Sequence, residues 1–219
     1  MKFAIFSVIF SLMMPAPLLA QAPAEKAFAM VRFAYLQMHP ETPDPLYLLT
    51  SEGVEALQIS SRTPREYHKI QHSTGVLLGV KGENAEQAIV PLASQKLPAA
   101  ARKLTALLSP ADEAGKYQIT FLDESKFKPG CVFFINQTGS AIGVTIDEKR
   151  FLVRASSEQL VPFASGKDSR NVFCSFHEKE VDGSFRLLNE STWNISRERA
   201  EICVFYKDLS LNRIKSRGM

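Results

Sequence analysis

Histidine is the residue type in this 219-residue chain with the plainest use in metal chemistry. His68 and His72 stand four residues apart in "YHKIQH", a spacing at which two imidazoles can bind one metal ion from the same side. A third ligand is not obvious nearby, and metal sites normally need one. Histidines that simply occupy a loop or a strand end are far commoner, so no metal site is predicted.

His177 is the best candidate for acid–base chemistry, because Glu178 and Glu180 follow it in "FHEKEVDG". A histidine next to a carboxylate can transfer protons to and from a substrate, which makes a periplasmic or secreted hydrolase the alternative function. The same residues adjoin "VDG", which predicts a hairpin turn where charged side chains simply face water. The turn is the simpler interpretation, and no catalytic residue is predicted.

The three cysteines lie in the apolar runs "CVFF", "VFCSF" and "EICVF". Loss of hydration raises the pKa of a thiol, so Cys131, Cys174 and Cys203 are expected to be small buried hydrophobes rather than nucleophiles. An odd number allows at most one internal disulfide. If a bridge forms, Cys174 with Cys203 is favoured, because both are expected in the middle of strands in the same half of the chain.

Other motifs give little support for a cofactor or a glycan. "ASGKDS" lacks the first glycine of a phosphate loop, since Val161 stands in its place, and no G-x-S-x-G sequence occurs. Three N-x-S/T triplets would be glycan acceptors in a secreted eukaryotic protein, but the short signal suggests a bacterium, and two fall at predicted strand ends. No cofactor is predicted. The triplets begin at Asn136, Asn189 and Asn194.

The N-terminus is typical of a secretory signal peptide. Lys2 precedes an apolar stretch over 3–14, and small residues follow it. The stretch is shorter than the roughly twenty residues that span a membrane. Residues 1–22 are therefore predicted to be removed, leaving an exported chain, periplasmic or secreted, without membrane insertion. The cut is open among Ala20, Ala22 and Ala24.

The charge of the chain is nearly balanced, with 26 Lys and Arg against 23 Asp and Glu and a net charge of +3. Such a balance predicts no strong attraction to nucleic acids or anionic membranes. The basic tail "NRIKSRGM" is interpreted as an edge strand whose cations discourage edge-to-edge pairing. With nucleic acids and membranes disfavoured, another envelope protein is the kind of partner that we expect.

Apolar residues alternate at period two throughout, with turn residues every eight to twelve positions. This pattern predicts an all-β fold, an antiparallel β-sandwich of ten or more short strands. "DESKFKPG" interrupts two apolar strands, so two sandwich-like subdomains are expected over 27–124 and 125–219. "VRFAYL" and "VFFINQ" share a rhythm, which raises the hypothesis that the halves are duplicates.

"KPGCVFFINQTG" predicts a strand buried between two layers. Cys131, Phe133 and Ile135 point to one side, while Val132 and Phe134 point to the other, so both faces are apolar. The residues that follow, up to Gly139, are expected to form the return turn.

The segment 97–108 permits two interpretations. Its leucines and alanines fall at helical spacing behind Pro98, but 103–108 can also form a strand that pairs with "YQITFLD". Periodicity alone slightly favours the helix and does not decide.

Aromatic residues are numerous, with fifteen phenylalanines and five tyrosines. A ligand-binding face would need several of them exposed on one side of a sheet. Most alternate with other large apolar residues and are expected in the core. The tyrosines Tyr35, Tyr47 and Tyr67 are expected to be partly exposed.

"YQITFLDESKFKPGCVFFINQTG", together with Trp193 ahead of "SRERAEICVFYKD", resembles a group of secreted bacterial all-β proteins that carry no assigned function. The resemblance covers mostly 100–219. It implies a strand rather than a helix at 103–108, and it implies no catalytic residue. The leading hypothesis is thus a non-catalytic envelope module with a structural or binding role, and a subunit of a larger assembly is a further alternative.

Overall fold

The structure is a computed structural model, which describes residues 27–38, 40–59, 66–83, 88–111, 113–163 and 169–219. The predicted signal peptide at 1–22 lies outside the described residues, as does most of "ASGKDS". Among the described residues, no helix is long and apolar enough to cross a bilayer.

The first half of the chain forms eight strands in two four-stranded sheets. Sheet A has the strand order β4-β1-β7-β8, and sheet B has the order β3-β2-β5-β6. The strands are β1 (Phe28–Tyr35), β2 (Leu46–Thr50), β3 (Gly53–Leu57), β4 (His68–Gln71), β5 (Val76–Lys81), β6 (Ile89–Gln95), β7 (Lys103–Pro110) and β8 (Tyr117–Asp123).

The second half repeats this arrangement. Sheet C has the order β12-β9-β15-β16, and sheet D has the order β11-β10-β13-β14. The strands are β9 (Cys131–Asn136), β10 (Ile142–Ile146), β11 (Lys149–Val153), β12 (Ser157–Pro162), β13 (Arg170–Lys179), β14 (Phe185–Ile195), β15 (Glu201–Asp208) and β16 (Arg213–Gly218).

The two halves share one topology, since each strand of the first half corresponds to the strand eight places later. β1 pairs antiparallel with β4 and parallel with β7. β9 likewise pairs antiparallel with β12 and parallel with β15. The predicted all-β sandwich fold is confirmed, with one difference: these two central pairs are parallel. In each half the first strand lies between the fourth strand, to which it is antiparallel, and the seventh strand, to which it is parallel.

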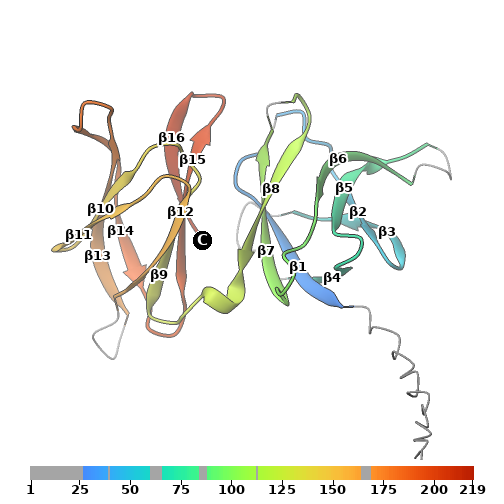
Figure 1. Cartoon of the computed structure of the whole chain (residues 1–219), viewed down its shortest axis with the longest axis horizontal. Coiled ribbons are helices and arrows are strands. Elements are labelled where there is room, and N and C mark those ends of the chain that lie inside the picture. Colours follow the sequence, from blue (N-terminus) through green and yellow to red (C-terminus); the bar gives the residue numbers. More distant parts are fainter. Residues whose placement is uncertain (1–26, 39, 60–65, 84–87, 112, 164–168) are drawn as a thin grey trace, which may run out of the picture.

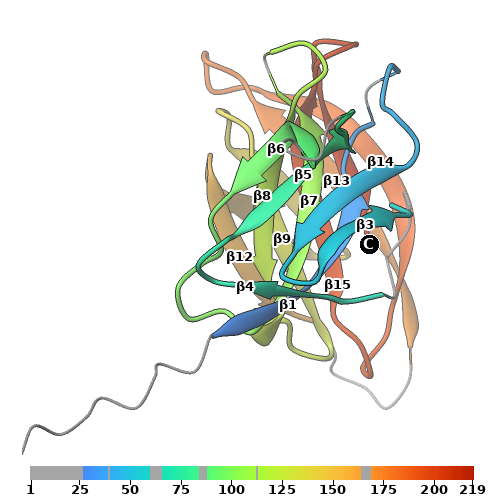
Figure 2. The same cartoon turned by 90° about the vertical axis from the view of Figure 1, so that its right-hand side faces the viewer.

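The four sheets stack as layers in the order B, A, C, D (Figure 1). Separate apolar clusters fill the space between B and A and the space between C and D. A third cluster joins A to C, and Figure 2 shows the stack from the side of sheet B. The third cluster contains Ala34, Leu36, Leu107 and Leu122 from the first half and Phe133, Ile135, Ile202 and Val204 from the second.

β9 confirms the prediction made for "KPGCVFFINQTG", because all six of its residues are buried. Val132 and Phe134 face the core of the second half, and Phe133 and Ile135 face sheet A. A strand covered on both sides needs apolar residues at every position rather than at alternate ones.

The segment 103–108 is a strand, as the resemblance implied, so the helix that periodicity slightly favoured is wrong. Leu104 and Leu108 point into the core of the first half, while Leu107 points toward sheet C. A strand buried on both faces has a continuous apolar run, and such a run also places leucines at helical spacing. Packing against sheet C therefore decided an ambiguity that the local pattern left open.

Polar contacts fix the connection between the halves. The short helix η1 (Glu124–Lys126) follows β8 directly. The two carboxylate oxygens of Glu124 accept hydrogen bonds from Arg32 Nε at 2.8 Å and from the Tyr67 hydroxyl at 2.7 Å. Burial and the hydrogen bond to Glu124 raise the pKa of Tyr67 to about 12. The contacts at Glu124 hold η1 against sheet A.

The other side of the connection is held by the second half. Lys126 Nζ pairs with Glu158 of β12 at 2.6 Å, and Phe127 contacts Phe133 with ring centroids 5.3 Å apart. Arg217 Nη1 donates to the carbonyl of Tyr35 at 2.6 Å. The halves therefore share an apolar interface with hydrogen-bonded margins.

Candidate functional site: the outer face of sheet D

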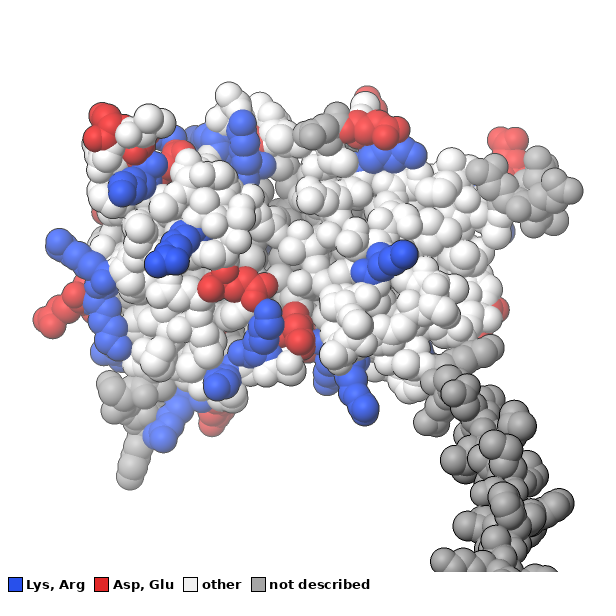
Figure 3. All heavy atoms as spheres, viewed as in Figure 1, with Lys and Arg blue, Asp and Glu red and all other residues white. Residues whose placement is uncertain are grey.

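Charge does not single out a binding surface on the face seen in Figure 3, where positive and negative side chains are interspersed. Exposed apolar side chains, by contrast, are concentrated on one surface. The described residues include ten large apolar side chains that are at least 39% exposed, and five of them lie on sheet D or on its β13–β14 hairpin. They are Leu152 (40%), Phe173 (49%), Val181 (107%), Phe185 (52%) and Leu187 (51%).

The strand registers bring these side chains together on the outward side of sheet D. Gly143 of β10 is paired with Leu152 on one side and with His177 on the other. His177 is in turn paired with Leu187 of β14. Paired residues project from the same face of a sheet, so these positions form one row across it. Gly143, Leu152 and His177 of this row line a shallow hollow of about 840 Å³. Phe173 and Phe185 line it too.

Gly143 leaves room for the ring of Phe185. A Cβ atom at position 143 would lie 3.0 Å from Cε1 and 3.1 Å from Cδ1 of Phe185. A glycine inside a strand often marks a place where another group approaches the backbone closely. The phenyl ring therefore lies over bare main chain and forms part of the floor of the hollow.

A β-bulge in β14 sets the direction of two consecutive leucines. The register shifts between Phe176 and His177, which are paired with Asn189 and Leu187, so Leu188 is an extra residue. Leu188 packs against the core of the second half, whereas Leu187 is exposed beside His177. The bulge thus adds an apolar side chain to the outer face.

The structure does not bring His177 to a carboxylate. Its neighbour Glu178 and the nearby Glu180 both bind Arg186, and Arg186 Nε lies 2.6 Å from Glu180 Oε1. The hydrogen bond to Glu180 and the charge of Glu178 raise the pKa of Arg186. Among the described residues, the imidazole of His177 has no hydrogen-bond or ion-pair partner. The hairpin carboxylates are thus occupied by Arg186 rather than arranged for proton transfer at His177.

His68 and His72 do not converge. Both are at or next to the extended strand β4, where four residues span about 13 Å. His68 Nδ1 lies 2.7 Å from Glu55 Oε1, and its ring contacts Phe33. Within the described ranges, no group of three His, Cys, Asp or Glu residues is placed to hold a metal ion.

All three cysteines are free and buried, so the pairing considered for Cys174 and Cys203 is not formed in this structure. Both thiols belong to the core cluster between sheets C and D. Burial raises the pKa of Cys174 to about 12 and raises that of Cys203 well above its usual range. These two thiols are placed as small core side chains.

Asn136 is a structural residue rather than an exposed glycan acceptor, because its side chain is buried. Its Oδ1 accepts hydrogen bonds from the amide of Thr138 at 2.9 Å and from the Thr138 hydroxyl at 2.7 Å. Its Nδ2 donates to the carbonyls of Ser140 at 2.8 Å and Arg154 at 3.0 Å. Asn136 thereby fixes the turn after β9.

The exposed aromatics were missed in the sequence, although one signal was present. In "NVFCSFHE", Val172, Cys174 and Phe176 are buried, so Phe173 shares the outward side with His177. A large aromatic residue at the polar positions of an alternating strand is the signal. By contrast, Tyr35 was expected to be partly exposed and is only 6% exposed, because it packs in the core of the first half beside Tyr117.

The described residues therefore form a tandem β-sandwich with one exposed apolar sheet face. A scan of the chain against protein-family models found no match, and a search of curated proteins found none either. The function must be inferred from the geometry of the site.

Proposed function

We propose that this chain is a non-catalytic binding module of the bacterial envelope, and that its contact surface for a partner protein is the outer face of sheet D. The observation that carries the proposal is the concentration of half-exposed Leu152, Phe173, Phe185 and Leu187 on one sheet face. Contiguous apolar patches of this kind mark interaction sites. The signal-like N-terminus and the resemblance to secreted bacterial proteins support the location.

The size of the patch supports weak binding by itself. Four half-exposed side chains of this size offer about 350 Å² of apolar surface, which corresponds to about 9 kcal/mol of gross stabilisation at 25 cal/mol per Å². Association itself costs about 4–15 kcal/mol, so this area alone supports only weak binding. A stable complex would also need contacts from the neighbouring hairpin around Val181, which is fully exposed.

The hydrolase alternative is not favoured by any observation at His177. It requires a carboxylate within hydrogen-bond distance of the imidazole, and Glu178 and Glu180 both bind Arg186 instead.

The proposal is tested with a matched pair of variants. Leu187 on sheet D and Leu211 in the β15–β16 turn are equally exposed, at 51% each, so Leu187→Lys and Leu211→Lys make the same chemical change at two surfaces. The mature chain would serve as bait for proteins of its own cell envelope. We expect a specific partner to be captured by the unaltered chain and by Leu211→Lys, and to be lost with Leu187→Lys.

A photoreactive amino acid adds a positional readout. Placed at position 173 it should crosslink to the captured protein, whereas at position 28, where Phe28 is 45% exposed on the first half, it should not. Equal capture by both lysine variants, or crosslinks from position 28 alone, would show that the outer face of sheet D is not the contact surface.

A further inference from the structure

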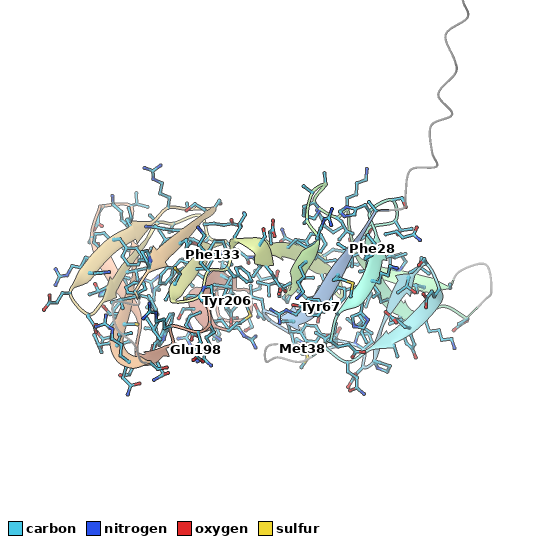
Figure 4. The ribbon with its side chains drawn as sticks, turned by 90° about the horizontal axis from the view of Figure 1, so that it is seen from below. Phe28, Met38, Tyr67, Phe133, Glu198 and Tyr206 are labelled. Atoms are coloured by element: carbon cyan, nitrogen blue, oxygen red, sulfur yellow. The ribbon has the colours of Figure 1, made fainter. Side chains whose placement is uncertain are left out.

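Strand β14 gives sheet D the longest free edge in the described part of the molecule. It has eleven residues, and its main chain pairs with β13 alone among the described residues. Figure 4 shows Glu198, in the loop that follows β14, near the margin of the second half. The other edge strands have only four to seven residues; they are β3, β4, β6, β8, β11, β12 and β16.

The edge formed by β14 is also poorly blocked. Native proteins interrupt edge strands with proline, charge or bulges, because unpaired main-chain groups can join a strand of another chain. β6 holds the corresponding edge of sheet B and contains Pro91, which has no N–H to offer. β14 has no proline, and Glu190 is the one charged residue over 189–195. Its bulge at Leu188 comes earlier, so 189–195 pairs with β13 in unbroken register.

The hydrogen bonds of sheet D show which main-chain groups point to this edge. The amide of Asp147 donates to the carbonyl of Phe173 at 2.9 Å, so the main chain of Phe173 is turned away from β14. Phe173 is paired with Thr192, and in an antiparallel ladder such a pair exchanges no hydrogen bonds. Thr192 therefore directs its N–H and C=O outward, as do Glu190 and Asn194. From the free side, no described residue bonds to the main chain at these three positions.

We propose that β14 pairs antiparallel with β14 of a second copy of this chain, about a twofold axis at Thr192. Thr192 then faces its own copy, and Glu190 faces Asn194 of the second copy. All six outward N–H and C=O groups become hydrogen-bonded, and no like charges meet. On the inner side of the sheet, the small Ser191 faces the large Trp193.

The sequence of β14 favours this register over its neighbours. A pairing centred on Ser191 would bring the bulged Leu188 opposite Asn194, and one centred on Trp193 would extend beyond Ile195, where the strand ends. Both would leave some of the six groups unpaired. A second copy is therefore the occupant whose side chains β14 itself specifies.

The symmetry has a consequence for partner binding, and this consequence rests on the proposed function. The axis is perpendicular to the sheet, so two four-stranded sheets D become one continuous sheet with both apolar faces on the same side. A partner protein could then contact two equal patches, and bivalent contact strengthens binding that is weak at each patch. The strand pairing itself does not depend on any partner.

Sedimentation of the mature chain alone tests the pairing. One short strand pair buries less than the roughly 1,200 Å² of a standard interface, so we expect a reversible dimer over about 10 µM to 1 mM. Thr192→Pro removes an outward N–H that β13 does not use, and it should weaken association at least about tenfold. Thr192→Val is the matched control, because it keeps the N–H and the shape of the side chain and should dimerise as the unaltered chain does.

A cysteine pair tests the register and does not depend on the folding of the proline variant. Residues on the axis lie about 5.5 Å apart between Cα atoms, within the range of a disulfide. The three native cysteines are buried, so Thr192→Cys adds the one accessible thiol among the described residues. Under mild oxidation it should form a covalent dimer. Ser94→Cys, at an exposed position on β6, should not.

Three results would overturn the proposal. The first is a chain that stays monomeric over the whole concentration range, which would leave β14 to a different partner or to water. The second is a dimer that a folded Thr192→Pro variant forms as well as the unaltered chain. The third is equal crosslinking at positions 192 and 94, which would indicate random collision. None of these results bears on capture of a partner by the outer face of sheet D, so the two proposals fail separately.

Discussion

Replacing Asn136 by alanine should destabilise the fold strongly, because the substitution removes a complete buried hydrogen-bond set. The side chain makes two accepted and two donated hydrogen bonds of 3.0 Å or shorter, and a longer one of 3.3 Å to the carbonyl of Val153. Each is worth about 1 kcal/mol net, and leaving buried partners unsatisfied adds to the loss, so we expect about 3–5 kcal/mol less unfolding free energy.

Asn136→Asp should be at least as harmful at neutral pH, although it preserves the shape of the side chain. A carboxylate would keep the acceptor for Thr138 but would place negative charge against the carbonyl oxygens of Ser140 and Arg154. The folded state would therefore raise the pKa of the new carboxyl. The stability of Asn136→Asp relative to the unaltered chain should therefore be highest below the unfolded pKa of about 3.9 and should fall as the pH rises through the raised pKa of the folded state.

Urea unfolding followed by circular dichroism measures both variants. Asn189→Ala is the control, since Asn189 is exposed on the edge strand β14, and it should change the unfolding free energy by less than about 0.5 kcal/mol. The reasoning is refuted if Asn136→Ala costs less than about 1 kcal/mol, or if Asn136→Asp is clearly more stable than Asn136→Ala at pH 7.

Three further predictions concern other parts of the fold. Hydrogen bonds from Lys215 and Ser210 lower the pKa of Asp208, so the contribution of Asp208 to stability should be present above about pH 3.9 and lost below it. Lys215→Met should weaken this pH dependence and should lower the unfolding free energy, measured by urea unfolding, by about 1 kcal/mol. The cysteines are buried and free, so a thiol reagent should label none in the native chain and three after unfolding without reductant; one labelled thiol would mean that a bridge forms. Gly143→Val should displace the ring of Phe185, and a changed aromatic NMR spectrum without loss of folding would reveal it, whereas an unchanged spectrum would contradict the close approach.

The sequence predicts the strands of this fold well, because alternation and turn residues are local signals. It also predicts the burial of β9, since both faces of that strand are apolar. The state of 103–108 depended instead on a layer contributed by the other half, which local periodicity does not contain. The parallel pairing of β1 with β7 likewise depends on contacts distant in sequence.

The candidate site was harder to predict for a related reason. His177 and its carboxylates are adjacent in sequence, but Glu178 lies on the other side of the strand and binds Arg186. Phe173, Leu187 and Gly143 are far apart in sequence and meet only through strand register and a bulge. Sequence proximity therefore suggested a proton-transfer pair that the fold separates, and it gave no indication of the apolar face that the fold assembles.

The repeated topology leaves two sheets with a free outer face, and the chemistry of those two faces differs. Sheets A and C cover each other, so only sheets B and D turn an outer face away from the molecule. These two outer faces are topologically equivalent but differ in chemistry. In the described part of sheet B, Val90 is the one large apolar side chain that is at least 39% exposed, whereas four such side chains lie on the strands of sheet D. Stability does not require this difference, because sheet B folds on the same plan without it. The exposed apolar side chains of sheet D are therefore better explained by contact with another molecule than by the needs of the fold.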